Sequence, residues 1–133
     1  MKLLDLMIEL VAGTLAVAGP FWVWRYYRVL PARVPIHFNF RGIADSWGKR
    51  AWIWLLPILG TVQYLFMTFL AGQPEVRPQG LMLGLLKAEV LALYLYIEIA
   101  TIDVALGRRQ RMGNGIWLLT VLVLITVFAF TPR

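Results

Sequence analysis

Long apolar stretches separated by short polar connections dominate the chain. Four of them, residues 4–24, 51–70, 81–102 and 115–130, are long enough to cross a lipid bilayer, because about 20 helical residues cover the ~30 Å hydrocarbon core. The pattern predicts an all-α integral membrane protein with four transmembrane helices. Residues 1–133 would form a single domain, with nothing left over for a soluble one.

The connection between the first two predicted helices, residues 25–50, is the longest polar segment. Its prolines favour extended backbone in the residues before them, and residues 34–40 alternate as in a short strand. We expect a folded lid over residues 30–50, with one apolar side packed on the helix ends and one polar side that satisfies backbone groups. The apolar positions are Ile36, Phe38 and Phe40, and the polar positions are His37, Asn39 and Asp45.

The third predicted helix carries most of the intramembrane polar residues. At 100° per residue, Lys87, Tyr94, Glu98 and Thr101 share one face, and Glu89, Tyr96 and Asp103 share roughly the opposite one. An ionised side chain at mid-bilayer costs about 2.5–3.5 kcal/mol. We therefore expect Lys87 and Glu89 to have protein or water partners, the third helix to be central, and Glu98, nearer the helix end, to reach the interface more easily.

Three further polar positions lie in the first two helices. Gln63 is near the middle of the second helix, where a buried amide favours an interhelical partner. Asp5 and Glu9 are four residues apart on one face near the start of the first helix. They are interpreted either as an interfacial acidic cap or as a buried polar pair that contacts another helix.

Apolar residues make up 60% of the composition, above the roughly 45–50% of soluble domains. The net charge of +6 resides mainly in residues 25–50 and 107–114, which hold nine of the 13 basic residues. Positive charge is retained on the cytoplasmic side, so both termini are predicted outside and both basic connections inside. These basic groups would face anionic lipid headgroups rather than nucleic acid. All six tryptophans lie on the same side of the predicted membrane.

Candidate chemistry is sparse. The chain has no cysteine and one histidine, which excludes disulfides, iron–sulfur ligation and multi-histidine metal sites. His37 and Asp45 are interpreted either as a proton-transfer pair or as a hydrogen bond that holds the lid together. We expect no enzyme activity, no cofactor and no metal.

The lid contains a spaced motif that begins at Leu30-Pro31 and Val34. Its other positions are Pro35, His37, Phe38, Asn39, Gly42, Asp45, Trp47, Gly48 and Arg50. With the tryptophan-rich helix that follows, this motif resembles the bacterial membrane domain of unknown function found at the N-terminus of SdpI-like proteins, the immunity proteins for the sporulation-delaying toxin. The resemblance covers about residues 15–65, and Arg50 stands where that family usually has lysine. It implies a multi-pass protein of the bacterial cytoplasmic (inner) membrane.

Three functions are compatible with these features. The first is a non-enzymatic protein whose lid recognises a membrane protein or peptide at the membrane surface, of the SdpI-like immunity or signalling type. The second is an accessory or structural subunit of a larger membrane complex. The third is a small transporter that uses Lys87, Glu89 or Glu98. The lid itself either binds a partner or only caps the helical bundle.

Overall fold

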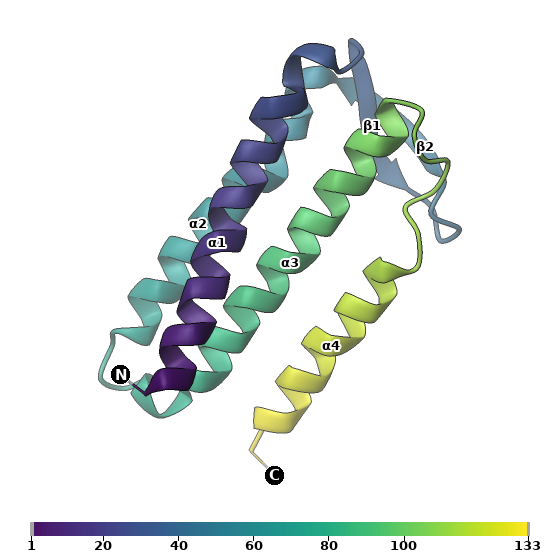
Figure 1. Cartoon of the computed structure of the whole chain (residues 1–133). Coiled ribbons are helices and arrows are strands. Elements are labelled where there is room, and N and C mark those ends of the chain that lie inside the picture. Colours follow the sequence, from purple (N-terminus) through teal and green to yellow (C-terminus); the bar gives the residue numbers. More distant parts are fainter. Residues whose placement is uncertain (1, 133) are drawn as a thin grey trace.

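The computed structural model describes residues 2–132. Four helices lie side by side, with a β-hairpin at one end and both chain termini at the other (Figure 1). The helices are α1 (Leu3–Tyr26), α2 (Leu55–Ala71), α3 (Gly80–Ala105) and α4 (Gly115–Phe130), and the strands are β1 (Arg33–Phe38) and β2 (Ala44–Lys49). Short 3-10 segments, η1 (Tyr27–Val29), η2 (Arg50–Trp54) and η3 (Arg77–Gln79), adjoin the helices.

Three helical segments are long and apolar enough to cross a membrane by length and composition. They are Leu3–Val29, Arg50–Ala71 and Arg77–Ala105. α4 begins and ends at the predicted residues, but its 16 residues rise only about 24 Å, less than a ~30 Å hydrocarbon core. The predicted helices are thus present, and three rather than four have the length of a full span.

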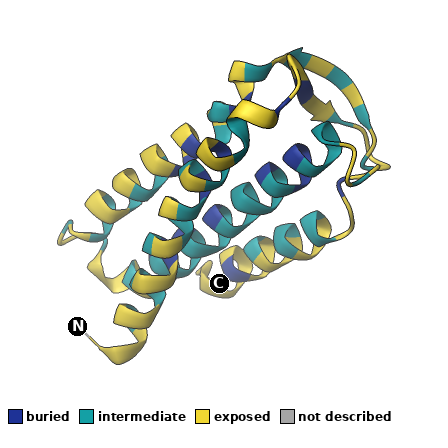
Figure 2. Cartoon of the chain, turned by 45° about the horizontal axis from the view of Figure 1, so that its top comes forward, coloured by how far each residue is buried: buried dark blue, intermediate teal, exposed yellow. Residues whose placement is uncertain are grey.

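α3 is the central helix, because it packs against α1, α2 and α4. Burial follows α3, whereas the outer faces of the other three helices are exposed (Figure 2). The prediction that the third helix is central is confirmed. The buried residues of α3 are Leu83, Lys87, Leu91, Glu98, Ala100, Thr101 and Ile102.

Glycines let α1 approach α3 closely. A Cβ atom on Gly19 would lie 3.0 Å from Glu98 Oε2, and one on Gly84 would lie 3.2 Å from Ile8 Cγ2. Neither position has room for a larger side chain without a shift of its neighbour. The absence of a side chain at Gly19 and Gly84 therefore allows the short distance between α1 and α3.

The predicted lid is folded, and it forms an antiparallel hairpin rather than an irregular loop, so the chain is not purely α-helical. Arg33 pairs with Lys49 at its base, and Phe38 pairs with Ala44 near its turn. The register shifts on both sides of His37. A shift of this kind breaks the two-residue alternation of a strand.

The predicted apolar side of the lid is wrong for two of its three residues, and the third, Phe38, is half-buried. Val34 and Pro35 are buried, while the side chains of Ile36 and Phe40 are 50% and 92% exposed. The irregular register explains Ile36, and Phe40 lies beyond the end of β1, in the turn. A small core at this end of the molecule packs the hairpin onto the helices; it consists of Val23, Leu30, Val34, Ile53 and Ile102.

Candidate functional site

Three polar side chains of the hairpin motif hold its turn. His37 Nδ1 donates to Asp45 Oδ1 across the strands at 2.6 Å. Asn39 Oδ1 accepts from the backbone N–H groups of Arg41 and Ile43 at 2.9 and 3.1 Å. The two bonds to Asn39 satisfy backbone N–H groups of the turn that the hydrogen bonds between the strands leave unpaired. The contacts are those of a shape-holding motif, and the His37–Asp45 pair forms part of it.

Two arginines and a glycine hold the base of the hairpin. Arg33 Nη2 donates to the Trp47 carbonyl at 2.7 Å. Arg50 Nη1 donates to the Leu30 carbonyl at 3.2 Å, and its guanidinium lies 4.9 Å from the centre of the Tyr27 ring. Arg50 is half-buried. Gly48 contributes through its missing side chain, because a Cβ there would lie 3.0 Å from Ile36 Cγ2, too close without a shift of Ile36.

The turn of the hairpin is bonded to the connection between α3 and α4. The backbone N–H of Met112 donates to the Gly42 carbonyl at 2.8 Å, and Gly42 has the left-handed φ of 73° that glycine adopts at low cost. The Met112 carbonyl in turn accepts from Tyr96 Oη at 2.8 Å and from Arg109 Nη1 at 3.1 Å. Sequence reasoning missed Met112, because its contacts use the backbone and leave no side-chain pattern.

A cavity of about 490 Å³, the turn pocket, lies between the hairpin turn and the start of α4. Its walls combine cationic, aromatic and hydrogen-bonding side chains, and they include His37, Asn39, Arg41 and Asp45 from the hairpin and Arg111 and Trp117 from the opposite side. Within residues 2–132, no three His, Asp or Glu side chains are grouped as metal ligands. The pocket has the makeup of a binding surface.

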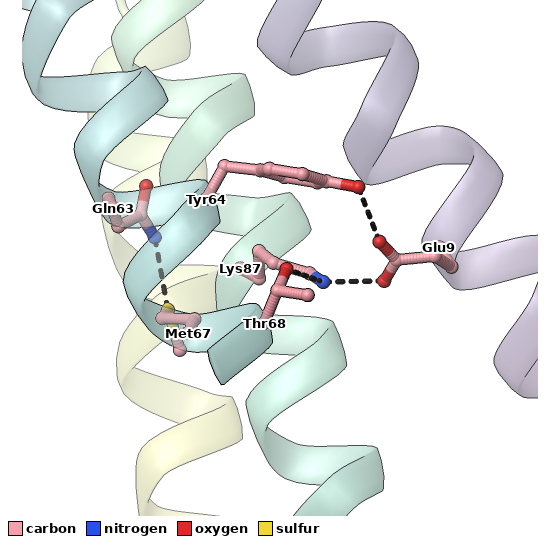
Figure 3. A network of polar contacts seen from close by, with 6 residues as sticks. All are labelled: Glu9, Gln63, Tyr64, Met67, Thr68 and Lys87. Carbon is pink, nitrogen blue, oxygen red and sulfur yellow. Dashed lines mark hydrogen bonds and ion pairs between the residues drawn. The ribbon is translucent and has the colours of Figure 1, made fainter. Parts of the chain in front are cut away.

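A second polar cluster lies between helices of the bundle (Figure 3). Lys87 Nζ donates to Glu9 Oε2 at 2.5 Å and to Thr68 Oγ1 at 3.0 Å. Tyr64 Oη donates to the other oxygen of Glu9 at 2.5 Å. The cluster joins α1, α2 and α3, so the expected partner of Lys87 is present. Glu9 contacts other helices, as the second interpretation predicted, but its side chain is 37% exposed and Asp5 is not part of the cluster.

The prediction of an interhelical partner for Gln63 is wrong. Gln63 Nε2 donates to Met67 Sδ on the same helix at 3.3 Å, and its Oε1 is buried without a hydrogen-bond partner among the described residues. Consecutive helical residues point about 100° apart. Tyr64 takes the direction toward α1, which leaves Gln63 facing elsewhere (Figure 3).

The two remaining glutamates of α3 differ. Glu89 Oε1 accepts from Thr126 Oγ1 at 2.7 Å, which ties α3 to α4 and gives Glu89 the expected partner. Glu98 is only 2% exposed, so the expectation that it reaches the interface is wrong. It shares the inward face of α3 with Lys87 and lies against Gly19 of α1.

The family model described as a domain of unknown function (DUF1648) matches residues 14–61. The matched segment contains the second half of α1, the hairpin and the start of α2. It covers less than half of the chain and carries no activity, organism group or immunity function. No curated protein and no solved structure matches the chain.

Proposed function

We propose that the chain is a small, non-enzymatic multi-pass membrane protein whose hairpin recognises a membrane protein or peptide at the membrane surface. The observation that carries this proposal is the contrast between a rigidly held hairpin and the side chains that it exposes. Phe40 in the turn is 92% exposed and Trp47 in β2 is 40% exposed, and Arg41 and Arg111 line the turn pocket together with Phe40.

Recognition accounts for this arrangement better than capping does. A hairpin that only capped the bundle would bury its large apolar side chains against the helix ends, because burial is what stabilises a cap. Here Val34 supplies that packing, while Phe40 points away from the core. Exposed aromatic and arginine side chains around a preformed pocket are typical of residues that contribute most to binding.

The type and placement of the protein are also part of the proposal. The resemblance of the loop motif to SdpI-like proteins is the basis for an immunity or signalling role in a bacterial cytoplasmic membrane. The excess of basic residues in the hairpin and in the α3–α4 connection is the basis for placing both on the cytoplasmic side, next to anionic headgroups. The termini would then lie outside.

Photo-crosslinking from single positions tests the recognition proposal. A photoreactive amino acid replaces Phe40 or Arg111 at the turn pocket, and Lys49, exposed at the base of β2, serves as the matched control. We expect one discrete partner from positions 40 and 111 in the native cells and none from position 49. We also expect Asn39→Ala, which releases the turn, to weaken that product while the protein still reaches the membrane.

Two results would overturn recognition by the hairpin. One is equal crosslinking from all three positions, and the other is no product from positions 40 and 111. A stoichiometric set of other subunits that persists in Asn39→Ala under mild detergent would favour the accessory-subunit alternative. The transporter alternative has less support, since two of its three candidate residues, Lys87 and Glu89, have an interhelical partner.

A further inference from the structure

A second cavity, the lateral pocket, lies directly beneath β1. Its volume is about 390 Å³, and its walls come from β1, from η2 with the start of α2, and from α3. Most of the wall is apolar and includes Phe38, Trp52, Leu56 and Ile97. Two α3 side chains, Glu98 and Thr101, supply polar groups. A mostly apolar cavity with a few placed polar groups has the composition of a small-molecule site, and its volume is within the usual range of about 300–1,000 Å³.

Glu98 forms part of the inner wall of this pocket, and its buried carboxyl group lies against Gly19 of α1. Its side chain is among the most buried in the protein at 2% exposure, and its Oε2 has no hydrogen-bond partner within residues 2–132. The ion pairs of the described chain use other carboxylates, namely those of Glu9, Asp45 and Asp103. Oε2 of Glu89 is also buried without a partner, but Glu89 is bonded to Thr126 through its other oxygen. A buried acidic group normally has a partner, and for Glu98 we look for that partner outside the chain.

The pocket is accessible from the surface of the bundle. Ile36, Trp52 and Leu55 on its wall are 50%, 56% and 46% exposed. They lie where the hairpin meets the helix ends, which is the level of the headgroups in the proposed membrane arrangement. A molecule that enters here would meet apolar side chains along its length, with Glu98 and Thr101 of α3 on the wall.

We propose that the lateral pocket binds an amphipathic amine, with its ammonium group on Glu98 and its apolar body along Phe38, Trp52 and Leu56. The ammonium supplies both the opposite charge and the hydrogen-bond donor that Glu98 lacks, and charge-assisted bonds of this kind are the stronger ones. An anionic ligand would meet like charge. This pocket shares only Phe38 with the turn pocket, and the proposal does not depend on the partner proposed above.

The test uses the full-length protein in phosphatidylcholine nanodiscs. The probe is an alkylamine that carries a diazirine at the far end of its chain, and crosslinked peptides are identified by mass spectrometry. Decylamine and decanol serve as competitors of equal chain length with and without a cation. Glu98→Gln removes the charge at nearly constant shape. Glu89→Gln is the matched control, because Glu89 lies on the same helix and is bonded to Thr126 instead.

We expect crosslinks on the peptides of β1 and the start of α2, competed by decylamine and not by decanol. Glu98→Gln should weaken amine binding about tenfold, which corresponds to about 1.4 kcal/mol, while Glu89→Gln should bind as the parent does. The proposal fails if Glu98→Gln binds the amine with unchanged affinity, or if decanol competes as well as decylamine. The second comparison needs only the parent protein, so the proposal stays testable even if the variant does not fold.

Discussion

Replacing Glu9 by alanine would leave Lys87 without its anionic partner, and we expect a loss of about 2 kcal/mol of stability in a bilayer. An unpaired ammonium at the membrane centre costs about 2.5–3.5 kcal/mol. Lys87 lies seven residues beyond Gly80, the first residue of α3, which is about 10 Å along the helix. The mid-plane of a ~30 Å core is about 15 Å deep, so a value below the full cost is appropriate.

The opposite change, Lys87→Met, should cost less. Glu9 has 37% of its side chain exposed, against 4% for Lys87, and it keeps the hydrogen bond from Tyr64. We expect a loss of about 1 kcal/mol, within the ~0.6–1.7 kcal/mol measured for interhelical hydrogen bonds in membranes. The double variant leaves no unpaired charge, so its loss should be about 1.5 kcal/mol rather than the ~3 kcal/mol of two independent effects.

Reversible unfolding by SDS in mixed micelles, followed by tryptophan fluorescence, measures these differences. Glu75→Ala and Lys49→Met are the charge-matched controls, because both residues are exposed in polar connections, and we expect changes within about 0.5 kcal/mol. Additive losses in the double variant would refute an ion pair between Glu9 and Lys87. So would a Glu9→Ala protein as stable as its parent, since Lys87 would then have another source of solvation.

Two further predictions concern packing and orientation. A Cβ on Gly115 would lie 2.5 Å from Cε2 of the Tyr96 ring, so Gly115→Ala should lower the stability by about 1–3 kcal/mol through overpacking in the same unfolding assay. Gly80→Ala is the control, because a Cβ there would have nothing within 4 Å, and it should not destabilise the protein. Equal stability of the two variants would contradict the packing of α4 on α3. Because the chain has no cysteine, single cysteines can be labelled with a membrane-impermeant maleimide in intact cells: Gln79→Cys should react and Gln110→Cys should not, and the reverse pattern would overturn the proposed orientation.

The sequence was sufficient for the helices and for the central place of α3. Apolar length defines a helix that can span a membrane, and the cost of unpaired charge requires Lys87 and Glu89 to face protein. α4 begins and ends at the predicted residues, Gly115 and Phe130, because polar residues flank this apolar segment on both sides. These features follow from local composition and from free energies that do not depend on neighbouring helices.

The directions of individual side chains did not follow from the sequence. Gln63 and Tyr64 are adjacent in a helix, and the rotation of α2 against α1 decides which of them finds a partner. Glu98 is near the helix end in sequence, but the space left by Gly19 on α1 receives it. In the hairpin, the shifted register around His37 depends on contacts with distant segments, so strand alternation alone assigned Ile36 to the wrong side.

The polar residues of α3 differ between its two ends. Those near its start hold helices together, and the end beneath the hairpin carries both candidate sites. Lys87 and Glu89 each have a hydrogen bond to a neighbouring helix. Oε2 is buried without a partner in both Glu89 and Glu98, but only Glu98 lies beneath the hairpin. Phe38 of β1 lines both the turn pocket and the lateral pocket. A change at Phe38 would therefore disturb both sites at once. Phe40 lines only the turn pocket and Glu98 lines only the lateral pocket of these two, so substitutions at these positions distinguish a surface partner from a bound amine.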